Sequence, residues 1–159
     1  MLDELLFALT IVSALGCGLM AGVFFAFSAF VMRGLARLPP AQGIAAMQAI
    51  NVAALEAPFM AAFFGSTVAC ALLAVASLLK WHESHALYRL IGSGVYLVGS
   101  FAVTAAFNVP RNDALAAVAA DSADGASRWA GYVAGWSAWN HVRAVACTVA
   151  AVLLILSLR

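Results

Sequence analysis

Polar side chains that could do chemistry gather in a few places along a chain that is otherwise almost wholly apolar. His141 could accept and return a proton near neutral pH, and Arg143 follows it two positions later with a guanidinium that could hold an anion. Trp136, Asn140 and Arg143 are four and three residues apart, so a helix would place them on one face. The pattern predicts a pocket with His141, Arg143 and Asn140 as its catalytic residues.

Other polar residues lie where they could reach the same pocket. Asn108 follows Thr104 by four residues, and Gln48 precedes Asn51 by three, so each pair would be neighbours on a helix. The candidate substrate-binding residues are Gln48, Asn51, Asn108, Arg111, Asn112, Trp136 and Trp139. The amides could instead bridge helices or cap helix ends, and the tryptophans could belong to a belt at a membrane interface.

Composition identifies the environment that must position these residues. Apolar residues make up 65% of the 159 residues, charged residues 9%, and the mean hydropathy is +1.01. A soluble domain usually carries about 25% charged residues. The formal charge of +1 has no basic run behind it, which excludes nucleic-acid binding. Cys17, Cys70 and Cys147 are scattered singly, as expected of small buried residues rather than of disulfides or metal ligands.

Four stretches have the roughly 20 apolar residues needed to span a bilayer. They cover residues 5–32, 58–79, 87–107 and 142–158. A polar lead-in helix is expected at 42–57. Pro110 is expected to end the third span, and a surface helical segment is expected within the connection 108–135. The prediction is a single all-α domain over residues 1–159, an integral membrane four-helix up-down transmembrane bundle with the polar cluster at one end.

The lipid bilayer is therefore the first expected partner. Five basic residues lie on the side of the polar cluster and three on the opposite side, which predicts that the cluster faces the cytoplasm. The expected location is a bacterial inner membrane. Gly18 and Gly22 fit the small-residue spacing that lets helices approach closely in lipid. This spacing favours packing within the bundle, with a homo-oligomer as the alternative.

No cofactor is predicted, and O2 would be a co-substrate. A zinc site usually needs about three or four His, Cys or carboxylate ligands, whereas His141 and Glu56 would supply two. The sequence has no phosphate-binding loop, dinucleotide fingerprint or Ser-His-Asp arrangement.

Four motifs make the chain resemble the anthrone oxygenase-like membrane protein family. They are GVFFAFS at 22–28, AMQAIN at 46–51, NVPRNDAL at 108–115 and WSAWNHVR at 136–143. The resemblance implies a four-helix transmembrane fold and, as in fungal members of polyketide pathways, oxidation of anthrones to anthraquinones. It implies functional roles for Gln48, Asn51, Asn108, Asn112, Trp136, Trp139, Asn140, His141 and Arg143. Arg33 and Arg111 depart from the proline and the aliphatic residue expected there, and Arg111 would add a cation beside the pocket.

The leading hypothesis is a monooxygenase that oxidises a planar hydroxylated aromatic with O2 and without a dissociable cofactor. His141 would be the general base, Arg143, Asn140 and Asn112 would stabilise the anion, and Trp136 and Trp139 would stack on the rings. Gln48 and Asn51 would orient phenolic oxygens. The alternatives are a non-enzymatic membrane module that binds a quinone, lipid or partner subunit, and a metal-dependent membrane oxidase.

Overall fold

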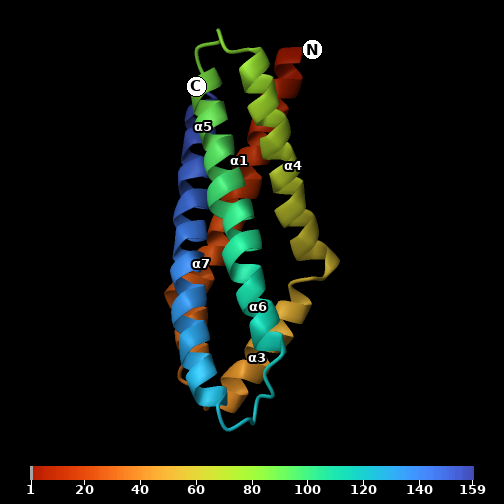
Figure 1. Ribbon diagram of the computed structural model, residues 1–159. Coiled ribbons are helices and arrows are strands. Elements are labelled where there is room, and N and C mark those ends of the chain that lie inside the picture. Colours follow the sequence, from red (N-terminus) through yellow and green to blue (C-terminus); the bar gives the residue numbers. More distant parts are fainter. Residues whose placement is uncertain (1) are drawn as a thin grey trace.

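The computed structural model describes residues 2–159 as helical rods that run alternately up and down, joined by turns (Figure 1). The first rod comprises α1 (Leu2–Ala26), the π-helix η1 (Phe27–Val31) and α2 (Met32–Leu35). The second is broken into α3 (Pro40–Ala53) and α4 (Ala57–Leu79). The third comprises α5 (Ala86–Tyr96), the π-helices η2 (Leu97–Ala102) and η3 (Thr104–Asn108), and α6 (Val109–Ala116); α7 (Gly125–Leu156) is the fourth. Over the described residues the all-α prediction is confirmed.

Four helical stretches are long and apolar enough to cross a membrane: Asp3–Leu35, Ala57–Leu79, Ala86–Ala116 and Gly125–Leu156. Large apolar side chains are exposed on the outside of the bundle, such as Leu15 at 69% and Leu79 at 83%. A soluble helix would carry charged residues there. The outward-facing apolar surface is what a helix bundle presents to lipid, and it indicates an integral membrane protein.

The structure differs from the expected connection between the third and fourth rods. The third rod continues through Pro110 to Ala116, and α7 already begins at Gly125, so the connection holds no separate surface helix. Pro110 is tolerated because it lies in the first turn of α6, where its missing N–H needs no partner. The backbone just before it has π-helical bonding, with the N–H of Val109 bonded to the Thr104 carbonyl five residues earlier.

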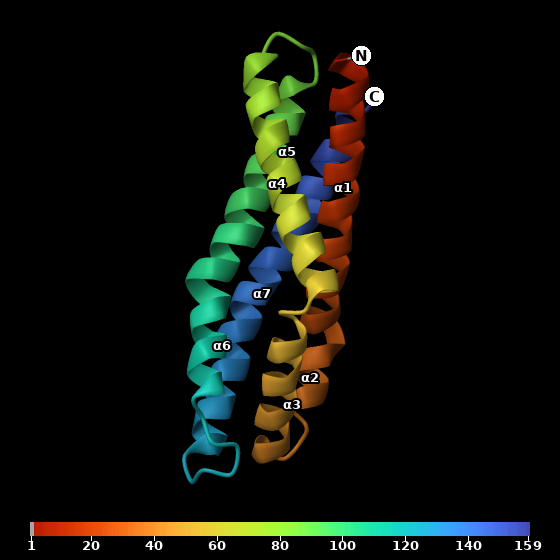
Figure 2. The same cartoon turned by 90° about the vertical axis from the view of Figure 1, so that its right-hand side faces the viewer.

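Two hydrophobic cores stabilise the bundle. One fills the half that contains both termini and includes Met20, Leu73, Tyr96 and Leu154. The other lies at the opposite end, where α3 packs against α6 and α7. Figure 2 shows the break between α3 and α4 part-way along the second rod. The break therefore lies at the junction of the two cores.

Close approach of the first two rods depends on a glycine other than the two singled out in the sequence. A Cβ at Gly16 would lie 2.2 Å from Ser66 Oγ, so α1 and α4 could not approach as closely with a larger residue. Gly18 and Gly22 are exposed and would have no neighbour within 4 Å. The expectation that this pair packs within the bundle is wrong. The three cysteines are free and fully buried, as predicted.

The loop between α4 and α5 is held by an ionic cluster near the chain termini. Lys80 Nζ pairs with Asp3 and lies 2.7 Å from Glu83, while Arg89 donates to Glu83 Oε2 at 2.6 Å. Hydrogen bonds from Lys80 and then Arg89 hold the pKa of Glu83 below its usual value. Hydrogen bonds to Asp3 and then Glu83 raise the pKa of Lys80. This cluster lies at the opposite end of the bundle from the second core (Figure 1).

Candidate functional site

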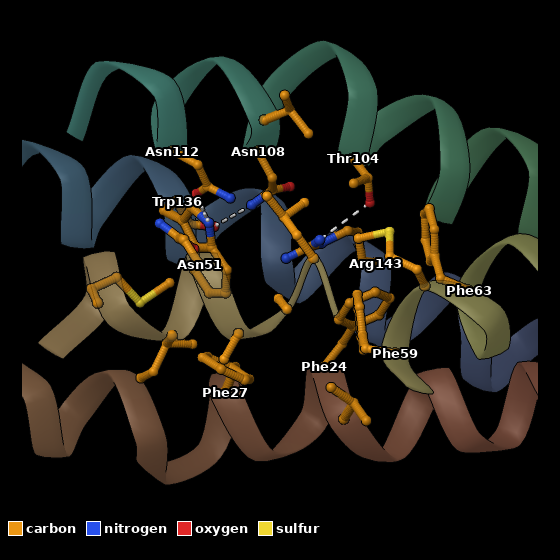
Figure 3. Close-up of a pocket in the computed structure, with 18 residues that line it drawn as sticks. Phe24, Phe27, Asn51, Phe59, Phe63, Thr104, Asn108, Asn112, Trp136 and Arg143 are labelled. Atoms are coloured by element: carbon orange, nitrogen blue, oxygen red, sulfur yellow. Dashed lines mark hydrogen bonds between the residues drawn. The ribbon is translucent and has the colours of Figure 1, made fainter. Parts of the chain in front are cut away.

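A cavity of about 390 Å³ lies where the second rod is broken, and all four rods line it (Figure 3). The break follows from Pro58, which lies in the first turn of α4 and has no N–H to continue the helix from α3. The backbone of Glu56, just before α4, is extended (ψ 155°). The lining of the cavity is mostly apolar and includes the aromatic side chains of Phe24, Phe27, Phe59, Phe63 and Trp136. The polar lining residues are Asn51, Thr104, Asn108, Asn112 and Arg143.

Arg143 is the one charged residue among the 18 lining residues described. It is 5% exposed, and its guanidinium donates to Thr104 Oγ1 at 3.1 Å and to Asn140 Oδ1 at 2.7 Å. Its Cζ lies 4.2 Å from the ring centre of Phe24 and 5.1 Å from that of Trp136. Within residues 2–159 it forms no ion pair, and its Nε has no hydrogen-bond partner. A buried cation is therefore held by neutral groups only.

Asn140 supports that cation from behind the cavity. It is fully buried and does not line the cavity. Its Nδ2 donates to the Phe24 carbonyl and to Ser28 Oγ, both at 2.8 Å. Ser28 belongs to η1, where the N–H of Met32 reaches the carbonyl five residues before it. Asn140 thus joins α7 to the first rod.

Two asparagines of the third rod line the cavity and differ in their hydrogen bonding. Asn112 Oδ1 accepts from Tyr132 Oη and from Trp136 Nε1, each at 2.9 Å. Asn108 is 1% exposed, and its Nδ2 donates to the Trp136 carbonyl at 3.3 Å. Asn108 Oδ1 has no partner within the described chain. The π-helix η3 carries both Thr104 and Asn108, in keeping with the frequent occurrence of such helices at functional sites.

The structure brings together five of the ten residues proposed for the site. Asn51, Asn108, Asn112, Trp136 and Arg143 line the cavity, with Asn140 directly behind it. Gln48 lies outside it and donates from Nε2 to the carbonyls of Leu115 and Val118, both at 2.9 Å. Gln48 therefore caps the end of α6 and fastens α3 to it.

The remaining three residues lie outside the cavity. Trp139 stacks on Phe107 with ring centres 3.5 Å apart. Arg111 donates to the Phe107 carbonyl at 2.7 Å and borders a different depression with Arg128. His141 is exposed and lines a shallow apolar groove between α5 and α7. The geometry does not bring the expected base to the expected pocket.

Sequence reasoning missed most of the aromatic wall. Phe24 and Phe27 stand in the first motif, but nothing in their spacing distinguishes cavity-lining phenylalanines from core ones. Thr104 was part of a helical spacing with Asn108, a signal that could have identified it. Tyr132 was recognisable only once α7 was known to begin at Gly125, because its hydroxyl reaches Asn112 from that added helix.

Among residues 2–159 no group of three or more His, Cys, Asp or Glu side chains could hold a metal ion. The cavity lining itself contains none of these residue types. The donor set present in the cavity therefore favours an organic ligand over a directly bound metal.

A family model described as anthrone oxygenase matches residues 59–153 of this chain. The match includes the motifs at 108–115 and 136–143, with Thr104, Asn108, Asn112, Trp136, Asn140 and Arg143, and begins after Asn51. No curated protein and no solved structure matches the chain.

Proposed function

This chain belongs to the anthrone oxygenase family, and we propose that it is a membrane oxygenase that oxidises a planar hydroxylated aromatic of the anthrone type with O2. One observation carries the proposal. The guanidinium of Arg143 is buried in an apolar cavity without a carboxylate partner. An unpaired buried charge costs several kcal/mol, so an anionic or strongly electron-rich ligand oxygen would be bound there.

The chemistry needs no external reductant. An anthrone has a CH2 group opposite its carbonyl, and loss of one CH2 proton gives an anion whose charge is carried largely by the oxygen. Arg143 would stabilise that oxygen. The anion gives electrons to O2, a C–O bond forms at the former CH2 carbon, and the resulting hydroperoxide loses water. CH2 and O2 thus become C=O and H2O, with one oxygen atom in each product.

The proton has no carboxylate or imidazole to receive it among the lining residues described. The proposal is that Arg143 lowers the pKa of the bound substrate, and that the proton passes to a water molecule. His141 is given no part in this step, because its side chain is exposed on another face of α7.

The cavity walls suit such a substrate. Its volume of about 390 Å³ is in the range of sites for small organic ligands. Phe59 and Phe63 are stacked on one side, with ring centres 6.1 Å apart. The exposed rim residues Ala53, Leu55 and Val109 are apolar, which favours entry of a poorly soluble molecule from the bilayer.

The test is aerobic incubation of the purified protein with anthrone, following oxygen uptake and quinone absorbance. Arg143→Gln is expected to lower kcat/KM by about 100-fold or more, the usual cost of removing an anion-stabilising donor. Arg111→Gln is the matched control, since Arg111 lies outside the cavity and its loss should leave the rate nearly unchanged.

An inert wild type, or an Arg143→Gln variant as active as wild type, would contradict the proposal. A wild type that binds anthrone without consuming oxygen would favour the binding module instead.

A further inference from the structure

Asn108 and Asn112 lie one helical turn apart on the third rod, and both line the cavity, yet only one of their side-chain carbonyls is free. Asn112 Oδ1 accepts two hydrogen bonds, one from Tyr132 and one from Trp136. Asn108 Oδ1 is buried and accepts none from residues 2–159. A buried polar atom without a partner costs about 1–3 kcal/mol. The free acceptor at Asn108 therefore needs an explanation that Asn112 does not.

The orientation of the Asn108 amide is fixed by its other end. Its Nδ2 donates to the backbone carbonyl of Trp136, an atom that can only accept. Turning the amide over would place two acceptors together. The oxygen is therefore the end left free on a residue that lines the cavity, as Figure 3 shows with Asn108 between Asn112 and Thr104.

We propose that Asn108 Oδ1 accepts a hydrogen bond from a ring hydroxyl of the substrate and thereby selects hydroxylated anthrones over unsubstituted ones. This inference rests on the proposed function. Thr104 precedes Asn108 by one helical turn and accepts a hydrogen bond from Arg143. Asn108 therefore lies about one turn from the hydroxyl that receives the cation, and the Cβ positions of such neighbours are roughly 5–6 Å apart. The substrate class is an aromatic with an electron-rich oxygen for Arg143 and a hydroxyl donor for Asn108.

The size of this preference depends on the difference in free energy between pairing the buried oxygen of Asn108 and leaving it unpaired. A hydroxyl that meets Oδ1 replaces the hydrogen bond it loses to water, whereas an unsubstituted ring leaves the buried oxygen unpaired. An ordered water on Oδ1 would be the competing occupant, and it would reduce the preference because the unsubstituted ring could bind beside it.

The experiment is anaerobic binding titration, which separates binding from turnover. The probes are anthrone and a series of monohydroxyanthrones, one for each ring position. Wild type is expected to bind at least one of the series about tenfold more tightly than anthrone, as one well-placed hydrogen bond predicts. In Asn108→Leu this ratio should fall to about twofold or less.

Asn112→Leu is the matched control. Asn112 has no free acceptor, so its replacement should weaken all probes alike and leave the wild-type ratio unchanged. Asn108→Ser, which keeps an oxygen acceptor in a smaller side chain, should retain part of the preference. These variants are compared only where they keep wild-type thermal unfolding.

The wild-type ratio decides the matter even where a variant fails to fold. Equal affinities of the wild type for anthrone and for every hydroxyanthrone would overturn the role of Asn108. This includes the case in which a water molecule occupies Oδ1. The proposed function would still stand. Loss of the preference in Asn112→Leu as well as in Asn108→Leu also overturns it. No binding of any probe to wild type contradicts the proposed function itself.

Discussion

Asn140 holds the guanidinium of Arg143 from one turn earlier on α7, accepting a hydrogen bond from Nη2 on its Oδ1 at 2.7 Å. The same amide donates from Nδ2 to the Phe24 carbonyl and to Ser28 Oγ. One fully buried side chain therefore fixes the cation and fastens α7 to the first rod. Because this partner is a neutral amide rather than a carboxylate, the positive charge remains available to a ligand.

Asn140→Asp should cancel that charge. A carboxylate would form an ion pair with Arg143, and the affinity for an anionic aromatic should fall about tenfold or more, while a neutral quinone should bind nearly as before. Titration of both ligand types gives the ratio of affinities. A general loss of structure would weaken both ligands, so an unchanged ratio would contradict the positioning role of Asn140.

Ser28→Ala is the matched control for that experiment. It removes one acceptor of the Asn140 amide but leaves the Phe24 carbonyl and the bond to Arg143 in place. Stability should fall by about 1 kcal/mol, with the ratio of anionic to neutral affinity unchanged.

His141→Ala should retain nearly full oxygenase activity. The side chain is exposed among Val142, Val145 and Val149 and does not line the cavity that contains Arg143. The measurement is the pH dependence of kcat/KM for both proteins with anthrone. A loss of about 100-fold, together with disappearance of an ionisation near neutral pH, would instead identify His141 as the base.

Gln48→Leu should loosen α3 from the bundle. Its Nε2 donates to the carbonyls of Leu115 and Val118. The Leu115 carbonyl also accepts from the N–H of Val118, so the variant would leave the Val118 carbonyl without its partner, at a cost of about 1–3 kcal/mol. Hydrogen exchange should accelerate across residues 40–53 before other helices. Gln42→Leu, an exposed change on the same helix, should leave exchange nearly unchanged. Equal effects of the two variants would show that the cap does not hold α3.

Much of the fold could be predicted because its signals are local. Runs of apolar residues long enough to cross a bilayer identified the rods, and the spacing of Trp136, Asn140 and Arg143 correctly indicated one buried face. The end of the third rod was misjudged because the penalty of Pro110 depends on hydrogen bonding that the sequence does not display. The structure removes that penalty through the π-helix η3 and a new helix start at Val109.

The residues that line the pocket were only partly predictable, because the direction in which a side chain points depends on how the helical rods are rotated against one another. His141 is adjacent to Asn140, yet one helical step of about 100° takes it from the buried face to the exposed one. Gln48 is a polar residue near the right end of the bundle, but the carbonyls it caps lie in and just after the last turn of α6, 67 and 70 residues away. Hydrophobic patterning identifies the buried face of one helix and says little about which polar groups meet across helices.

The loop between α4 and α5 should become less protected at both extremes of pH. The pKa of Glu83 is lowered from 4.5 in the folded protein. The stability that its ion pairs give the loop is therefore fully present above that value and is lost as the pH falls through the lower folded-state pKa. The pKa of Lys80 is raised from 10.5, so its contribution is lost as pH rises through the higher folded-state pKa. Proteolysis at residues 80–85 should therefore be slowest between these limits. Glu83→Gln should abolish the increase in the rate of proteolysis at low pH. If that increase were unchanged in the variant, Glu83 would be excluded as its cause.

The contact between α3 and α7 requires glycine at position 43. A Cβ there would lie 2.8 Å from the ring of Trp129, which is 4% exposed and stacked on Tyr132. Gly43→Ala should therefore destabilise the protein by about 1–3 kcal/mol, the usual cost of overpacking a core. The displaced ring should also disturb Trp136, because Tyr132 stacks on that residue in turn, with ring centres 6.3 Å apart.

Gly131→Ala provides a control of opposite sign on α7. Gly131 is exposed within the helix, and an added Cβ would have nothing within 4 Å. Alanine there should stabilise the helix by roughly 0.5–1 kcal/mol. Thermal unfolding in detergent, followed by tryptophan fluorescence, measures both variants, and anaerobic binding of anthrone reports on the cavity. If Gly43→Ala unfolded at the same temperature as Gly131→Ala, α3 would not lie against Trp129 as closely as described. That contact would then not support the wall of the cavity.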